Sequence, residues 1–125
     1  MNIEIVDLLS VDLLRDNPDK YYLFGDNLEG WGKKGQAVIR GEPNAIGIPT
    51  KVAPKRDVDS YFTDDNFEMN KQFIDDAFAK IPVGSTVVVP KAGLGTGLAQ
   101  LDKRAPKTFA YLQSQIGTDN DQLNK

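Results

Sequence analysis

The chain has 125 residues, of which 40% are hydrophobic and 26% charged, and this balance predicts one globular domain with its own core. Its formal net charge of -3 disfavours binding of long DNA or RNA, which would need a local basic patch. Cysteine and histidine are both absent, which excludes disulfides, thiolate catalysis, Ser-His-Asp machinery and histidine metal ligands, so no metal centre is predicted.

Strands and helices are expected to alternate along the first half of the chain. Ser10 is a residue type that caps helices, and Pro18 is a residue type that stops them. Gly25 follows an aromatic, apolar run of the kind found in buried strands. The expected elements are a strand at 2–6, a helix at 11–17, a strand at 20–24, a short helix at 35–40 and a strand at 45–48.

The second half continues the alternation after a charged, proline-containing segment at 51–60, which predicts a mobile surface loop. Apolar residues at helical spacing then predict the most clearly marked helix of the chain, and a continuous β-branched run predicts a strand covered on both faces. The expected elements are a helix at 64–81, a strand at 85–90 and a last helix that begins between 102 and 106.

This order predicts a layered α/β domain with a mostly parallel or mixed central sheet. The domain is expected to span residues 1–116, followed by a polar tail at 117–125. The first residues lack the basic region of a signal peptide, and no stretch has the length and hydrophobicity of a membrane span. A cytoplasmic protein with no membrane partner is therefore expected.

Two glycine-rich loops, GDNLEGWGKKG at 25–35 and KAGLGTGL at 91–98, each follow a predicted buried strand. Ligands of open α/β sheets bind beyond the carboxyl ends of the strands, so both loops are expected to share one crevice. Glycine lets backbone N–H groups approach a phosphate, although the same residues also serve turns that need a positive φ. The predicted binding residues are Gly30, Trp31, Gly32, Lys33, Gly35, Thr50, Lys91, Gly93, Leu94, Gly95, Thr96 and Gly97.

The first loop contains the G-x-G-x-x-G pattern at residues 30–35, but a Rossmann loop should follow its strand directly, and five residues intervene here. Neither loop has the G-x-x-x-x-G-K-[ST] pattern of a Walker A motif. The patterns therefore disfavour both a Rossmann dinucleotide site and P-loop nucleotide hydrolysis.

Polar residues at the tip of the second strand have two interpretations. Asp26 and Asn27 would be presented to a ligand, or they would form an Asx turn. Trp31 would stack on a base or cover a ribose, or it would fill the edge of the core.

Arg40 and Glu42 would form an ion pair or contact phosphate, or they would be a solvated surface pair, which is favoured. Asp75 and Asp76 are interpreted as solvated only. Positive charge for a phosphate would come from Lys33, Lys34 and Lys91, with Lys51 as a further polar contact, although most lysines are solvated.

The strand end FGDNL at 24–28, the glycine loop after it and VPKAGLGTGL at 89–98 resemble a compact macro domain, similar to small versions found in phages and bacteria. The resemblance implies a three-layer α/β/α fold that binds ADP-ribose. It places Asn27 beside the distal ribose, together with residues 30–35, and residues 93–97 around the diphosphate. On this assignment Gly95→Val is expected to block binding with little unfolding.

The sequence therefore predicts binding of ADP-ribose or a related nucleotide diphosphate, with no cofactor. Any enzyme activity would be of the ADP-ribosyl hydrolase or ADP-ribose 1''-phosphate phosphatase type, with hydrolysis at C1''. Asp26, Asn27 and Glu29 would form the catalytic set, and Asp26 or Glu29 would be the base. The alternative is a non-enzymatic phage or bacterial protein that sequesters a nucleotide signal or blocks a host protein. A module for single-stranded nucleic-acid ends is a third hypothesis, which the acidic composition disfavours.

Overall fold

The computed structural model describes the backbone of residues 2–123 and the side chains of residues 2–117. Strands and helices alternate as expected, with short 3₁₀ helices, labelled η, among them. The elements are β1 (Asn2–Val6), α1 (Val11–Asp16), β2 (Tyr21–Asn27), η1 (Gly35–Ile39), β3 (Ala45–Lys51), η2 (Val58–Ser60), η3 (Asp64–Asn66), α2 (Phe67–Phe78), β4 (Thr86–Pro90), α3 (Leu101–Arg104) and α4 (Pro106–Leu123).

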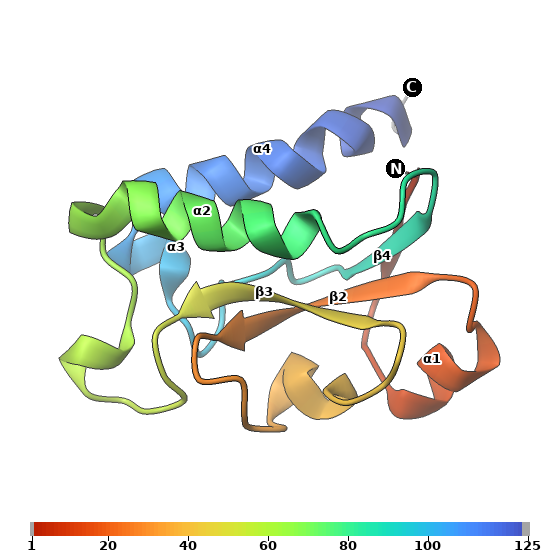
Figure 1. Ribbon diagram of the computed structural model, residues 1–125, viewed down its shortest axis with the longest axis horizontal. Coiled ribbons are helices and arrows are strands. Elements are labelled where there is room, and N and C mark those ends of the chain that lie inside the picture. Colours follow the sequence, from red (N-terminus) through yellow and green to blue (C-terminus); the bar gives the residue numbers. More distant parts are fainter. Residues whose placement is uncertain (1, 124–125) are drawn as a thin grey trace.

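The strands form a four-stranded sheet in the order β1-β4-β2-β3, and every neighbouring pair is parallel. Helices lie on both faces of this sheet: α2 and α4 cover one face, while α1 and η1 cover the other (Figure 1). The layered α/β class predicted from the sequence is confirmed, and of the two sheet arrangements left open, mostly parallel or mixed, the structure has the parallel one. None of the helices in the described part of the chain is long and apolar enough to cross a membrane.

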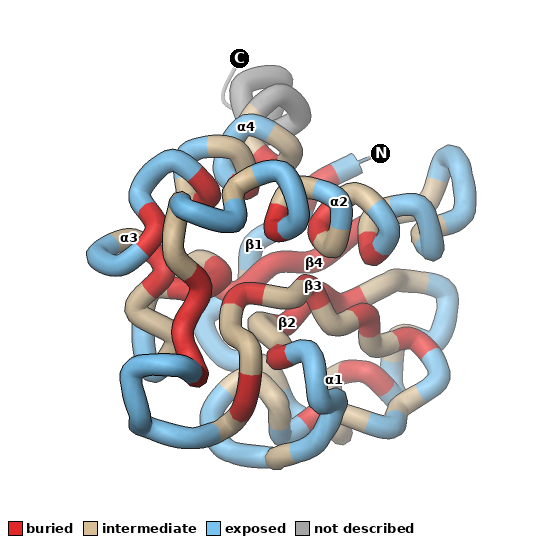
Figure 2. The backbone as a smooth tube through the Cα atoms, turned by 60° about the vertical axis from the view of Figure 1, so that its left-hand side comes forward, coloured by how far each residue is buried: buried red, intermediate tan, exposed pale blue. Residues whose placement is uncertain are grey.

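Each face of the sheet has its own hydrophobic core, because successive side chains of a strand point to opposite faces. Val87 and Val89 of β4 pack with α2 and α4, whereas Val88 between them packs with Leu14 of α1 and Ile39 of η1. The run at 86–90 is therefore covered on both faces, as its β-branched composition predicted. Figure 2 shows the buried residues gathered in the central strands and the exposed residues on the surrounding loops.

Several element boundaries differ from the sequence prediction. β2 and β3 each continue three residues beyond the predicted strands, because they pair with each other as far as Asn27 and Lys51. The segment at 35–40 forms a 3₁₀ helix rather than an α-helix. The helix α4 continues through the predicted tail to Leu123, while residues 124–125 of that tail lie outside the described part.

The predicted helix at 64–81 begins instead as η3, because the carboxylate of Asp64 caps a different helix. Asp64 accepts hydrogen bonds from the backbone N–H groups of Lys107 (2.9 Å) and Thr108 (3.0 Å) in the first turn of α4. Asp75 was interpreted as merely solvated, and this is wrong, since it accepts a hydrogen bond from the hydroxyl of Tyr111. Contacts of η3 and of α2 with α4, which no local pattern encodes, account for the first and the second difference respectively.

Candidate functional site

A cleft with a volume of about 640 Å³ lies at the carboxyl ends of β2 and β3, beside the loop that follows β4. A smaller hollow of about 230 Å³ adjoins it and shares Gly25, Thr50 and Gly97 with its lining. The connection that leaves β2 runs to η1 on one face of the sheet, and the connection that leaves β4 runs to α3 and α4 on the other face (Figure 1). The cleft therefore occupies the position at which ligands bind to open parallel sheets.

Asn27 shapes the first glycine loop with both ends of its amide. Its Oδ1 accepts hydrogen bonds from the backbone N–H groups of Glu29 (3.0 Å) and Gly30 (2.9 Å), and its Nδ2 donates to the carbonyl of Trp31 (2.9 Å). The side chain is buried, although the residue borders the cleft. This arrangement is the Asx turn named above as the alternative to ribose binding.

Asp26 forms an ion pair with Arg40 at the floor of the same loop. Its Oδ1 lies 2.5 Å from Nη2 of Arg40 and accepts the backbone N–H of Asn27 at 2.7 Å. Arg40 also donates from Nε to the carbonyl of Gly32 at 2.8 Å. A Cβ atom at Gly47 would collide with Asp26, so only glycine fits under this carboxylate. Of the roles considered for Arg40, the structure shows an ion pair, with Asp26 as the partner, and the interpretation as a solvated surface charge is wrong.

The third predicted catalytic residue, Glu29, lies outside the residues that line the cleft. Its carboxylate accepts a hydrogen bond from Nε1 of Trp31 at 2.8 Å. Trp31 is 52% exposed and borders the cleft, so it does not fill the edge of the core. Of the proposed catalytic set, the structure brings Asp26 and Asn27 to the cleft.

The second glycine loop folds mostly onto itself rather than into the cleft. Leu94 is 2% exposed and belongs to the hydrophobic core, and the hydroxyl of Thr96 donates to the carbonyl of Ala92 at 2.8 Å. Gly95 has a φ of +84°, and a Cβ atom there would lie 2.9 Å from Cβ of Leu101. Packing and turn geometry thus account for much of this loop.

The predicted binding residues therefore divide into two groups. Those that line the cleft or the adjoining hollow are Trp31, Gly32, Gly35, Thr50, Gly95 and Gly97. Those that lie outside both linings are Gly30, Lys33, Lys91, Gly93, Leu94 and Thr96.

Gln36 connects the two glycine loops, and sequence reasoning missed it. Its Oε1 accepts the backbone N–H of Gly25 at 3.0 Å, and its Nε2 donates to the carbonyl of Gly93 at 2.7 Å. It thereby fixes the end of β2 against the loop that follows β4. No local pattern marks this role, because the two partners are far apart in the sequence.

Four cations line the cleft without a carboxylate partner: Lys34, Lys51, Lys55 and Arg56. In the part of the chain that the structure describes, none of them forms an ion pair. Three of these residues come from the segment at 51–60, which was expected to be a mobile surface loop. The segment is instead held by hydrogen bonds from the N–H groups of Val52 and Ala53 to the carbonyl of Ser60. The three basic residues of this segment were the sequence feature that could have indicated an anion-binding surface here.

Tyr61 contacts two cations, Lys51, which lines the cleft, and Arg104, which lies outside its lining. The Nζ atom of Lys51 is 4.5 Å from the ring centroid, and the guanidinium carbon of Arg104 is 3.9 Å from it. Gln100, which is left-handed at φ +49°, accepts a hydrogen bond from Nε of Arg104 at 2.9 Å. Burial and then the charge of Arg56 lower the pKa of Lys51; the charge of Asp57 partly opposes them, and Arg104 adds a smaller lowering. The positive charge here is thus incompletely compensated.

Comparison with known families and proteins gave one match. A model described as a family of unknown function (DUF7831) matches residues 5–115. No curated protein and no solved structure matched the chain.

Proposed function

The chain belongs to the family of unknown function DUF7831. For this chain, we propose binding of ADP-ribose or a related nucleotide diphosphate in the cleft at the ends of β2 and β3. The observation that carries this proposal is the group of four cations without carboxylate partners in a protein whose net charge is -3. Like charges held close together repel one another, and a bound phosphate relieves that repulsion. An anionic ligand is therefore the occupant that the electrostatics favour.

The size and position of the cleft support a nucleotide rather than a bare ion. Its volume of about 640 Å³ lies within the range of roughly 300 to 1,000 Å³ typical of small-molecule sites. Its place at the carboxyl ends of parallel strands is the usual one for nucleotides in α/β folds. The resemblance of 24–28 and 89–98 to a macro domain selects ADP-ribose among the candidates, and the layered α/β architecture is compatible with it.

The roles of the residues differ from those expected on the resemblance alone. We assign the phosphate groups to Lys34, Lys55 and Arg56, with the backbone around Gly97 on the other side of the cleft. The loop at 91–96 mainly packs against the protein rather than around the diphosphate. Asn27 supports the ligand indirectly, by fixing the loop that carries Trp31.

Binding without turnover is the form of this function that the geometry supports best. Asp26 is the single carboxylate among the described residues that line the cleft. One of its oxygens already interacts with Arg40 and with the N–H of Asn27. To act as a base toward water it would have to weaken an ion pair that also fixes the glycine loop. These observations favour sequestration of a nucleotide over its hydrolysis.

Calorimetric titration with ADP-ribose, ADP, ATP and NAD tests the proposal. We expect micromolar binding that is strongest for ADP-ribose and weakens with added salt. Absence of heat with all four ligands would refute the nucleotide site. Release of ADP-ribose from a C1'' derivative, followed in parallel, would show turnover and refute the binding-only form.

Two neighbouring lysines supply a matched control. Both side chains are exposed, but Lys34 lines the cleft and Lys33 lies outside it. Lys34→Ala is expected to weaken ADP-ribose binding by about 10-fold to 150-fold, because one hydrogen bond between charged groups contributes about 1.5 to 3 kcal/mol. Lys33→Ala removes the same charge from the same loop and is expected to leave the affinity within about 2-fold, since a lysine outside the lining makes no direct contact with the ligand and its exposed charge is screened by salt. Equal losses would mean that only the overall charge matters.

A further inference from the structure

Trp31 is exposed but held in place, an unusual combination for a large aromatic side chain. It is the single tryptophan of the chain and is 52% exposed. Its indole Nε1 donates to Glu29 at 2.8 Å, and its backbone carbonyl accepts from Nδ2 of Asn27 at 2.9 Å and from Nη2 of Arg40 at 3.4 Å. The ring is thus fixed through both its backbone and its side chain.

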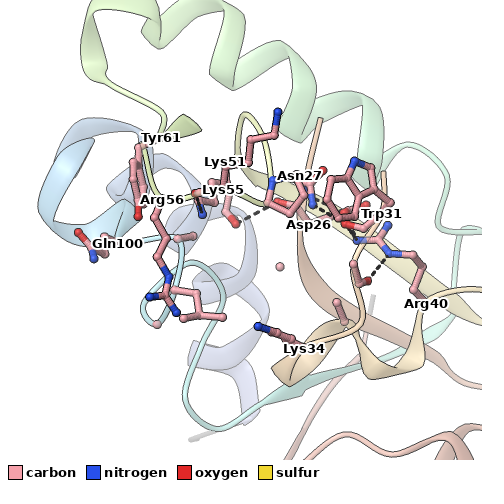
Figure 3. A pocket seen from close by; sticks show the side chains of 18 residues that line it. Asp26, Asn27, Trp31, Lys34, Arg40, Lys51, Lys55, Arg56, Tyr61 and Gln100 are labelled. Atoms are coloured by element: carbon pink, nitrogen blue, oxygen red, sulfur yellow. Dashed lines mark hydrogen bonds and ion pairs between the residues drawn. The ribbon is translucent and has the colours of Figure 1, made fainter. Parts of the chain in front are cut away.

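Trp31 lines the same cleft as the unpaired cations. Figure 3 shows Trp31 and Arg40 on one side of the cleft, and Tyr61, Arg56 and Gln100 on the opposite side. The loop that carries Trp31 also approaches the basic segment directly, since a Cβ atom at Gly32 would lie 3.7 Å from Cβ of Pro54. The cleft therefore has Trp31 on one side, beside the paired Arg40, and the unpaired Arg56 on the other.

A fixed, exposed ring suits a planar ligand group. Stacking on an aromatic face requires no particular hydrogen-bond pattern, and a ring that is already ordered loses little conformational entropy on binding. The hydrogen bond from the indole nitrogen to Glu29 joins two solvent-exposed side chains. The shape of the loop does not require this bond, so it serves to orient the ring.

We infer that Trp31 is the platform on which the base of the nucleotide stacks, while its phosphates lie against Lys55 and Arg56 on the opposite side. This orientation rests on the proposed function and makes it more specific. The site selects ligands that combine a planar base with a phosphate group. Trp31 contacts the ligand directly, and Glu29 is a positioning residue that acts through the indole.

Two probes separate the contribution of Trp31 from that of the cations: ADP, which has a base and a diphosphate, and inorganic pyrophosphate, which has no base. Trp31→Ala is expected to weaken ADP binding by roughly 5-fold to 150-fold, the effect of losing one base-stacking contact, and to leave pyrophosphate within about 2-fold. Glu29→Ala is expected to cause a smaller loss that is also selective for ADP. Lys34→Ala should weaken both ligands.

Fluorescence of the same tryptophan gives an independent readout in the unmodified protein. ADP is expected to quench or shift the emission of Trp31, and pyrophosphate is expected to change it little. Circular dichroism and thermal unfolding establish that each variant is folded before its affinity is compared.

The outcomes distinguish this inference from the function on which it rests. If the unmodified protein binds neither ADP nor pyrophosphate, the phosphate site and the stacking platform are both overturned. If it binds ADP and Trp31→Ala leaves that affinity unchanged, or weakens both ligands equally, the platform is overturned and the phosphate site stands. Selective loss of ADP binding together with an ADP-specific fluorescence change supports the orientation.

Discussion

Gly95→Ala is expected to destabilise the fold, because the structure places two separate costs at this position. A φ of +84° is unfavourable for alanine by about 1–2 kcal/mol. The new Cβ atom would also lie 2.9 Å from Cβ of Leu101, in the first turn of α3, and overpacking of this kind costs about 1–3 kcal/mol. The sum is about 2–5 kcal/mol, or a fall in Tm on the order of 10 °C or more for a chain of this length.

Two other glycines of the chain separate these costs. Gly84 has nearly the same φ, +83°, with open space around its Cβ position, so Gly84→Ala carries the backbone cost alone. Gly97 has neither a positive φ nor a neighbour within 4 Å, so Gly97→Ala should change stability by less than about 0.5 kcal/mol. The free energy of unfolding of the three variants, from urea denaturation, should therefore fall in the order Gly97→Ala, Gly84→Ala, Gly95→Ala.

Equal unfolding free energies for Gly95→Ala and Gly84→Ala would refute the steric argument at Leu101. The expectation that Gly95→Val would block binding with little unfolding is corrected by the same geometry, because valine brings more atoms into the space that Leu101 occupies. A loss of ligand binding in that variant would reflect a disturbed fold.

Three further predictions concern polar groups that hold the layers together. Partial burial of the Asp64 carboxylate opposes its ionisation, but hydrogen bonds from the first turn of α4 outweigh this effect and lower its pKa. Asp64→Ala should therefore lower the free energy of unfolding by about 0.5–2 kcal/mol, measured by urea denaturation at neutral pH. Because the folded pKa is the lower one, this difference should shrink as the pH falls below about 4, and a constant difference would contradict the capping role. A hydrogen bond to Asp75, followed by burial, raises the pKa of Tyr111 to about 12, so Tyr111→Phe should remove the last tyrosine to ionise in an alkaline absorbance titration. Asn44 is buried and donates hydrogen bonds to the carbonyls of residues 14, 17 and 20. Asn44→Ala should therefore destabilise the protein by about 1–3 kcal/mol in the same urea assay. An unchanged denaturation midpoint would mean that water replaces the amide.

The sequence predicted those elements of the fold whose formation depends on adjacent residues. The β-branched run at 86–90 and the cap at Ser10 were both found, since a strand covered on both faces and a helix N-cap depend on adjacent residues. The position of the cleft at the ends of β2 and β3 also followed, because parallel strands that alternate with helices bring their carboxyl ends to one edge.

The lining of the cleft was predicted less well, for the opposite reason. A glycine-rich sequence is typical of both turns and phosphate-binding loops. Only the burial of Leu94 in the core and the close approach of Gly95 to Leu101 show that this loop mainly forms a packed turn. Charged residues on a segment such as 51–60 are usually solvated, so their convergence on a cleft becomes visible only when the segment is placed beside β2. Gln36 is a similar case, since its two partners belong to different loops.

The sequence by itself determined the α/β class and the edge of the sheet at which a ligand would bind, and it left open whether the sheet is parallel or mixed. These properties follow from periodicity, caps and the order of elements, which act over a few neighbouring residues. The tertiary structure alone decided that Asp26 pairs with Arg40, that Tyr61 contacts Lys51 and Arg104, and that an anchored Trp31 lines the same cleft as the cations. Electrostatic and stacking interactions depend on distance in space, and residues from separate elements reach those distances only when the layers have packed together.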